Sequence, residues 1–239
     1  MCRRIAGRIE ELHLAGLSHY KTYLADHREE WKKLESFCRI SISRFYRDKS
    51  VFQFLQDVVL KELAQEAGTD SVRCWCCGCA AGEEPYTLSL LWHHFLKPSF
   101  PSKDIEIIAT DSMKHMLHRA LKGHYAGSSI KELPAALLQA AFIRQNKQYL
   151  LKSAYRDSVR FLQQDVRKRM PAGPFHLILC RYLVFTYFDE KLQGKLLEKI
   201  LTRLVTGGAL VLGKIDRLPY TTEKLEPWSE GDRIYRKIR

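Results

Sequence analysis

The chain has 239 residues, of which 46% are hydrophobic, and a formal net charge of +12 at pH 7. This apolar content is ordinary for a globular protein with a sizeable core. No apolar run approaches the roughly 20 residues of a membrane-spanning helix, so no membrane insertion is expected. The excess of Lys and Arg indicates an acidic partner. Because no nucleic-acid-binding signature accompanies these dispersed residues, nucleic acid is not expected, whereas an anionic membrane surface and an acidic protein partner both stay open.

Residues 1–48 are expected to form an N-terminal helical region, since apolar residues from Ile5 to Phe37 recur near helical spacing. The first eight residues carry the positive charge of a secretory signal, but Glu10 and Glu11 interrupt any apolar core. A cytoplasmic location is therefore expected. Basic residues of this region form either a solvated face or a surface for an acidic partner; they are Arg3, Arg4, Arg8, Lys21, Arg28, Lys32 and Lys33.

Residues 49–239 alternate between helical and strand patterns, which predicts an α/β domain with a mostly parallel sheet. Helices are expected at 51–67, 85–95, 113–121 and 192–204. Strands are expected at 72–77, 105–110, 159–162, 175–180, 209–212 and 233–238, with Gly207-Gly208 as a turn. A small β-hairpin around Asn146-Lys147 is expected within an insertion at about 142–160.

Four of the seven cysteines are clustered at Cys74, Cys76, Cys77 and Cys79. They alternate along a strand whose two faces should both be buried. Zinc ligands must converge tetrahedrally, which side chains on opposite strand faces cannot do alone. We interpret these cysteines as small buried hydrophobes and expect no metal site.

The first strand runs into a turn that begins at Gly78 and ends at Gly82, and a helix follows. A buried strand, a glycine turn and a helix are typical of nucleotide-type α/β folds, with the ligand at the carboxyl end of the strand. The spacing differs from Gly-x-Gly-x-x-Gly, and Glu83 and Glu84 in the first helical turn would repel a pyrophosphate. These carboxylates suit the ammonium and sulfonium groups of S-adenosyl-L-methionine (SAM).

Polar residues follow three further strands at the same predicted edge of the sheet. Asp111 can accept hydrogen bonds from both hydroxyls of a ribose. Gln164 or Asp165 is placed to accept one from an adenine amino group. Arg181 and Tyr182 follow the strand at 175–180. Each residue alone is weak evidence, because strand ends often carry Asp for turn reasons, but together they predict a cofactor cleft.

Several segments resemble the CheR-type chemotaxis receptor methyltransferases, and the resemblance runs from about residue 3 to the end. They are Ser43-Arg44-Phe45-Tyr46-Arg47-Asp48, Trp75-Cys76-Cys77-Gly78-Cys79-Ala80-Ala81-Gly82-Glu83-Glu84-Pro85-Tyr86, Ala109-Thr110-Asp111, Phe175-His176-Leu177-Ile178-Leu179-Cys180-Arg181-Tyr182, Tyr187-Phe188-Asp189 and Gly207-Gly208. The resemblance implies a Rossmann-like SAM-dependent methyltransferase fold. It also implies methyl transfer from SAM to glutamate carboxylates of a receptor-like protein, such as the cytoplasmic helices of a chemoreceptor, with S-adenosylhomocysteine as product.

The resemblance also assigns the site. The residues implied to bind the cofactor are Ser41, Ser43, Arg47, Gly78, Glu83, Glu84, Asp111, Gln164, Asp165, Val166, Arg181 and Tyr182. Arg47 and Tyr187 are the expected catalytic residues: the first as a fork that holds a carboxylate in two hydrogen bonds, the second as a hydroxyl donor. A glutamate with a pKa of about 4.3 is already ionised at neutral pH, so no general base is needed. The insertion corresponds to the small β-subdomain that docks a receptor peptide in some members of the family.

The chain departs from the family pattern at several positions. His176 replaces an Asp, Ala81 stands where Thr or Ser is usual, and Tyr182 replaces the Asn after Cys-Arg. Tyr is bulkier than Asn and has a single hydroxyl in place of a carboxamide. The N-terminal helical region is also shorter than usual. Two alternatives therefore stay open: a noncatalytic SAM-binding or scaffold relative, and a methyltransferase for another acidic or small-molecule substrate.

Overall fold

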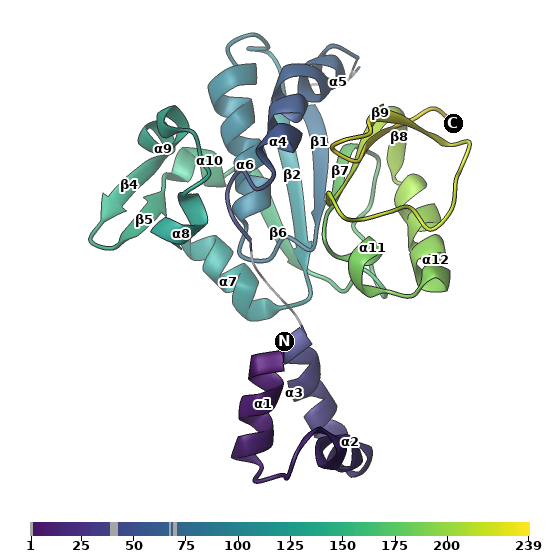
Figure 1. Cartoon of the computed structure of the whole chain (residues 1–239). Coiled ribbons are helices and arrows are strands. Elements are labelled where there is room, and N and C mark those ends of the chain that lie inside the picture. Colours follow the sequence, from purple (N-terminus) through teal and green to yellow (C-terminus); the bar gives the residue numbers. More distant parts are fainter. Residues whose placement is uncertain (1, 39–42, 67, 69–70) are drawn as a thin grey trace. The chain divides into compact units, whose positions relative to one another are not determined.

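The computed structural model describes residues 2–38, 43–66, 68 and 71–239. The chain forms two compact units, Met1–Ile42 and Ser43–Arg239. The smaller unit contains three helices (Figure 1, purple), which are α1 (Cys2–Glu11), α2 (Leu17–Asp26) and α3 (Arg28–Cys38). Among the described residues, no helix has both the length and the apolar character needed to cross a membrane.

A buried carboxylate links the three helices of the smaller unit. Glu30 accepts hydrogen bonds from Nη2 of Arg8 at 2.8 Å and from the hydroxyl of Tyr20 at 3.0 Å. Arg8 also pairs with Glu11 at 2.9 Å. Arg8 therefore belongs to the packing of this unit, which corrects its inclusion among the residues available to an acidic partner. The side chains of Arg3 and Lys32 lie outside the described part.

The larger unit is built on a seven-stranded sheet with the order β6-β2-β1-β7-β8-β10-β9 (Figure 1). Its strands are β1 (Ser71–Cys77), β2 (Asp104–Asp111), β6 (Val159–Gln163), β7 (Phe175–Cys180), β8 (Leu204–Leu212), β9 (Leu225–Ser229) and β10 (Ile234–Lys237). The pairs from β6 to β8 are parallel, and β10 runs antiparallel to both of its neighbours. This mostly parallel sheet with helices on both faces confirms the predicted fold class.

Side chains alternate between the two faces of the sheet, and each face packs against its own helices. Cys74 and Cys76 belong to the cluster formed with the segments from α4 to α6, whereas Trp75 and Cys77 belong to the cluster formed with α11 and α12. The helices of the first face are α4 (Lys49–Phe54), α5 (Leu60–Glu66), α6 (Glu83–Leu91) and α7 (Lys114–Lys122); those of the second are α11 (Val184–Tyr187) and α12 (Glu190–Leu201).

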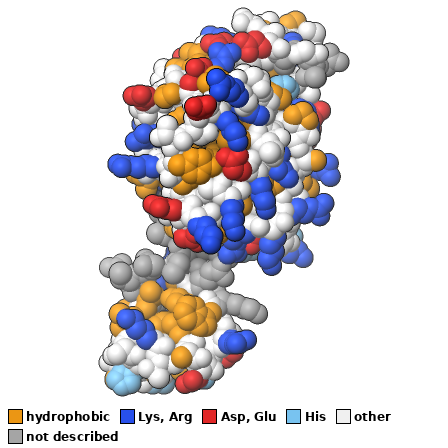
Figure 2. Space-filling view, turned by 90° about the vertical axis from the view of Figure 1, so that its right-hand side faces the viewer, with side chains coloured by type: hydrophobic (Ala, Val, Ile, Leu, Met, Phe, Trp, Pro, Cys, Tyr) orange, Lys and Arg blue, Asp and Glu red, His pale blue; other side chains and the backbone are white. Residues whose placement is uncertain are grey.

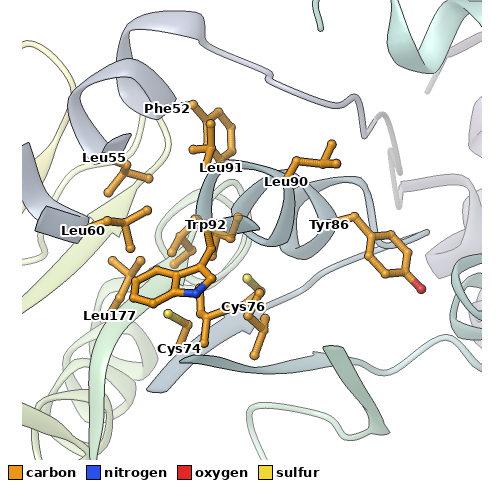
Figure 3. Close-up of a cluster of buried hydrophobic side chains, with 14 of the residues drawn as sticks. Phe52, Leu55, Leu60, Cys74, Cys76, Tyr86, Leu90, Leu91, Trp92 and Leu177 are labelled. Atoms are coloured by element: carbon orange, nitrogen blue, oxygen red, sulfur yellow. The ribbon is translucent and has the colours of Figure 1, made fainter. Parts of the chain in front are cut away.

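The first cluster fixes α6 against the sheet. Trp92 begins the π-helical turn Trp92–Leu96 that extends α6, and its indole lies over Cys74 and Cys76 of β1 (Figure 3). A second π-helical turn, Leu55–Val59, joins α4 to α5. The cysteines of the 74–79 cluster are buried and free, which confirms their interpretation as small hydrophobes. Among the described residues, no group of three or more His, Cys, Asp or Glu side chains is arranged to hold a metal ion.

A second sheet with the order β3-β5-β4 forms the insertion. Its strands are β3 (His124–Ala126), β4 (Phe142–Gln145) and β5 (Gln148–Leu151), with α8 (Gly127–Ile130) and α9 (Ala135–Ala141) between the first two and α10 (Ser153–Arg156) after the last. The predicted hairpin is confirmed at 142–151. Strand β3 was not predicted, because a strand of three residues has too short a pattern to read.

Two predicted elements near the C-terminus need correction, and one strand was missed. The helix expected at 192–204 ends at Leu201, and Gly207-Gly208 lies inside β8 rather than in a turn before it. The ladder with β7 shifts register here, and Gly207 has φ 81°, so a bulge takes up the extra residues. Strand β9 was missed because Pro227 favours a loop interpretation, although proline is tolerated in an edge strand.

Candidate functional site

The glycine turn after β1 folds back onto β2. The backbone N–H groups of Gly78 and Cys79 both donate to the carbonyl of Thr110, at 2.8 and 3.0 Å. Gly78 and Gly82 have φ of 79° and 89°, in the region that favours glycine. A Cβ at Gly78 would also lie 2.7 Å from Cδ2 of Leu183. This turn therefore requires glycine at position 78 both for its backbone angles and for its close approach to the end of β7.

Asp111 ends β2 and is 7% exposed. Its Oδ2 accepts from the N–H of Ala80 at 2.9 Å and its Oδ1 from the N–H of Met113 at 2.8 Å. A carboxylate offers about four lone-pair positions, so each oxygen retains capacity for one more donor. The arrangement fits the expectation that Asp111 holds a ribose diol.

At the end of β6, Gln164 and Asp165 differ in what they offer a ligand. The carboxylate of Asp165 accepts from Nη2 of Arg167 at 2.6 Å and from its Nε at 2.9 Å, and this pairing lowers the pKa of Asp165. The Oε1 atom of Gln164 is buried and has no hydrogen-bond partner among the described residues. Gln164 therefore fits an adenine amino donor better than Asp165 does. Val166, also named from the sequence, is buried in the second hydrophobic cluster.

Glu83 is the least satisfied acidic side chain of the site. It is buried, and its Oε2 has no hydrogen-bond partner among the described residues. Burial raises the pKa of Glu83, while a hydrogen bond from the Ser43 side chain acts in the opposite direction. A buried carboxylate with one oxygen that lacks a hydrogen-bond donor fits a ligand ammonium. Ser43 thus lies beside Glu83, whereas Ser41 falls outside the described residues.

Arg181 joins three segments that are far apart in the sequence. Its guanidinium is buried and donates to Oε2 of Glu84 at 2.9 Å, to Oδ2 of Asp48 at 2.5 Å and to the carbonyl of Arg47 at 3.1 Å. Burial lowers the pKa of Arg181, but the two carboxylates more than offset this and the pKa is raised. Burial raises the pKa of Glu84, and Arg181 counters that effect without cancelling it. Arg181 and Glu84 therefore bind each other. Their effect on a ligand would be indirect, through the positions in which they hold the surrounding segments.

Tyr182 has a left-handed backbone, with φ 54°. Its hydroxyl donates to the same Oδ2 of Asp48 that Arg181 binds, at 2.5 Å, and accepts from the N–H of Lys214 at 3.3 Å. The guanidinium carbon of Arg47 lies 3.8 Å from the centroid of the Tyr182 ring. Arg47, Asp48, Arg181 and Tyr182 are thus brought together, as the sequence motifs predict for three of them.

Asp216 was missed by the sequence analysis. It is 1% exposed, and its Oδ2 accepts from the N–H groups of Tyr182 and Gly213, both at 2.8 Å, while Oδ1 accepts from the hydroxyl of Thr186. Asp216 therefore holds the end of β7, the end of β8 and α11 together. The only signal in the sequence was its position four residues after β8, where an acid is commonly read as a turn residue.

Tyr187 ends α11 and is 50% exposed. It is therefore accessible to a macromolecular substrate, and its catalytic role stays a prediction. It does not share the contacts that link Arg47, Tyr182 and Asp48.

Comparison with known proteins places the chain in a family. The family model described as "CheR methyltransferase, SAM binding domain" matches residues 41–233. Chemotaxis protein methyltransferase 2 of Vibrio cholerae is 32% identical over 218 residues, which are 88% of this chain and 75% of that protein. An uncharacterized 104.1 kDa protein of Rhodobacter capsulatus, named for the hypE 3' region, is 28% identical over 238 residues, or 99% of this chain but only 25% of that protein.

A solved structure adds no further argument. SAM-bound CalS10, an amino pentose methyltransferase from Micromonospora echinaspora, is 19% identical, with a TM-score of 0.39. The matched region is 70% of this chain and 51% of the CalS10 chain. The assignment depends instead on the family model and on the Vibrio cholerae relative. The chain belongs to the CheR methyltransferase family, whose SAM-binding domain it contains, and its cofactor is S-adenosyl-L-methionine.

Proposed function

We propose that this protein is a SAM-dependent O-methyltransferase that methylates glutamate carboxylates of an acidic, receptor-like helical protein. The observation that supports this most is the position of Arg47 against the ring of Tyr182, two residues after the carboxyl end of β7. A guanidinium fork can hold a carboxylate in two hydrogen bonds. The net charge of +12 favours an acidic substrate; Figure 2 shows Lys and Arg side chains over one face of the molecule.

The cofactor, when bound, supplies an electrophilic methyl group on a positively charged sulfur. A substrate carboxylate oxygen would accept that methyl group, and the electron pair of the broken carbon–sulfur bond would stay on sulfur. The products are a neutral ester and a neutral thioether. The glutamate is ionised at neutral pH, so no residue of the chain needs to remove a proton.

The residues of the chain would then orient the cofactor and the substrate carboxylate and exclude water. Asp111 would hold the ribose, Gln164 the adenine amino group, and Glu83 the ammonium group. Arg181 is neutralised by Glu84 and Asp48, at 2.9 and 2.5 Å, and therefore does not compete with Arg47 for the substrate carboxylate. Alignment of the two reactants in this way can lower a barrier by up to roughly 7–11 kcal/mol.

The test uses SAM carrying a labelled methyl group and an acidic receptor-like protein with several glutamates. The proposal expects label on the protein that is released as methanol in mild base, as an ester requires. Arg47→Ala should lower the transfer by at least about 100-fold, since loss of orientation has effects of that size. The matched control is Arg236→Ala, which removes another guanidinium stacked on an aromatic ring, 4.6 Å from the centroid of Trp228, and should transfer at the wild-type rate.

Either of two results would overturn the proposal in favour of an alternative function. Binding of S-adenosylhomocysteine without any turnover would favour the noncatalytic scaffold, which the Tyr182 substitution motivates. Turnover in cell extract without base-labile protein label would favour another acidic or small-molecule substrate.

A further inference from the structure

The contacts of Tyr182 show what its side chain does in this structure. The hydroxyl is engaged on both sides, as donor to Asp48 and as acceptor from the Lys214 N–H. It therefore has little capacity left for a ligand. What remains is the aromatic face, and the guanidinium of Arg47 lies over it at 3.8 Å from the ring centroid.

The ring is held in place from several directions. Asp216 accepts from the Tyr182 N–H and maintains its left-handed backbone, and Asp48 fixes the hydroxyl end. Gly213 leaves room for the ring, because a Cβ there would lie 2.7 Å from both Cδ1 and Cε1 of Tyr182. A ring restrained at its backbone, its hydroxyl and its edge is a rigid surface for a flexible arginine.

The same carboxylate connects this ring to the buried ion pairs. Oδ2 of Asp48 accepts from Arg181 and from Tyr182, both at 2.5 Å. Asp48 directly follows Arg47 in the chain, so one carboxylate anchors the backbone beside Arg47 and the ring beneath its side chain. Arginine loses considerable rotamer freedom when it is held in one geometry, and a stacked ring reduces the number of geometries it can adopt.

We propose that Tyr182 is a positioning residue that holds the Arg47 guanidinium by stacking, in place of the contacts that an Asn carboxamide would make. The proposal deepens the methyl-transfer function and rests on it for the rate measurements. A carboxamide has no extended aromatic face, so the arrangement is particular to a chain with Tyr at this position.

The test is a double-mutant cycle with Arg47→Ala and Tyr182→Leu, measured as kcat and KM for methyl transfer. Tyr182→Leu alone should lower kcat/KM about 10-fold, in line with a cation–π contact of intermediate burial. In the Arg47→Ala background the same change should cost less than about twofold, since coupled residues are not additive. Tyr182→Phe should recover most of the rate, because the ring remains. Tyr182→Asn should behave like Tyr182→Leu.

The matched control is Tyr220→Leu. It also deletes a tyrosine whose hydroxyl donates to a carboxylate. The acceptor is Oε1 of Glu198, at 2.7 Å, which lies on α12 and not beside Arg47. Its effect on the rate should be below about twofold, as for an ordinary surface substitution. The proposal would be overturned if Tyr182→Leu lowered kcat/KM by the same factor in the Arg47→Ala background as in the wild type. It would also be overturned if Tyr182→Phe were as impaired as Tyr182→Leu.

A second measurement separates this inference from the proposed function. The side-chain Nε–Hε signal of Arg47 in ¹⁵N NMR, assigned by its loss in Arg47→Ala, should carry an upfield ring-current shift. That shift should persist in Tyr182→Phe and disappear in Tyr182→Leu. If the wild-type protein transfers no methyl group, the proposed function fails while the NMR shift still decides the stacking. If the Arg47 signal is unchanged in Tyr182→Leu, the positioning role is wrong even where methyl transfer is found.

Discussion

The guanidinium of Arg181 reaches the carboxylate of Glu84 at 2.9 Å, although 97 residues separate them in the chain. The same guanidinium reaches Asp48 from a third segment. Glu84 lies in the first turn of α6, Asp48 directly precedes α4, and Arg181 directly follows β7. One buried cation therefore sets the relative positions of the three segments that carry the site.

Replacement of that cation should be costly. Arg181→Met leaves two carboxylates without their partner, and the free energy of unfolding should fall by about 3–5 kcal/mol. Denaturant unfolding measures the change. Arg239→Met is the matched control, because its ion pair with Glu223 at 3.1 Å is exposed and should contribute at most about 1 kcal/mol. A loss for Arg181→Met no greater than that of the control would show that the carboxylates are readily solvated.

Glu83→Gln should stabilise the folded protein and weaken SAM binding. Burial raises the pKa of Glu83 above its ordinary value of 4.5, so the folded state prefers the protonated form. The wild type therefore loses stability relative to the variant as pH rises from about 4.5 through the higher folded pKa. Thermal unfolding at several pH values measures this: the Tm advantage of Glu83→Gln should be small at low pH and grow to a plateau. Glu226→Gln, at an exposed site, should show no such trend, and a variant advantage that shrinks with rising pH would contradict the assignment.

Gly213→Ala should impair methyl transfer although it removes no polar group of the site. The added methyl would lie 2.7 Å from the Tyr182 ring and from Oδ2 of Asp216, so the ring must move. We expect a loss of about 10-fold in kcat/KM, since small displacements of positioning groups have large effects, and about 1–3 kcal/mol of stability. Gly127→Ala is the control, because its Cβ would meet only Tyr149, at 3.9 Å. Equal rates in the two variants would mean that the ring does not need its present position.

Gln164→Leu and Asp165→Asn should separate the two candidates for the adenine amino group. The Oε1 atom of Gln164 is a buried acceptor without a hydrogen-bond partner among the described residues. Replacement of Gln164 should therefore weaken S-adenosylhomocysteine binding by up to about 10-fold. Asp165 is engaged by Arg167 at 2.6 Å, so Asp165→Asn should stay within about twofold of wild type. Calorimetric titration measures both, and the reverse order of the two effects would reassign the contact to Asp165.

The strand ends of the site were predictable because the relevant physics is local. Asp111 and Gln164 each lie two residues after an apolar run, and parallel strands present their carboxyl ends at one edge of a sheet. Strand β9 and the bulge at Gly207 were not predictable in this way. Their stability comes from pairing with distant strands, which overrides the local signals of Pro227 and of Gly207-Gly208.

The sequence by itself determined the α/β class, because apolar periodicity and motif spacing can be followed along the chain, and it predicted the cofactor edge and the residues expected there. Only the tertiary structure decided which of those residues pair with each other. Asp165 is engaged by Arg167, Arg181 by Glu84 and Asp48, and the Tyr182 hydroxyl by Asp48. Asp216, buried among Tyr182, Gly213 and Thr186, had no distinctive local pattern. The physical reason is that a buried polar group must be satisfied by whatever donors folding brings to it, and those donors lie far away in the sequence.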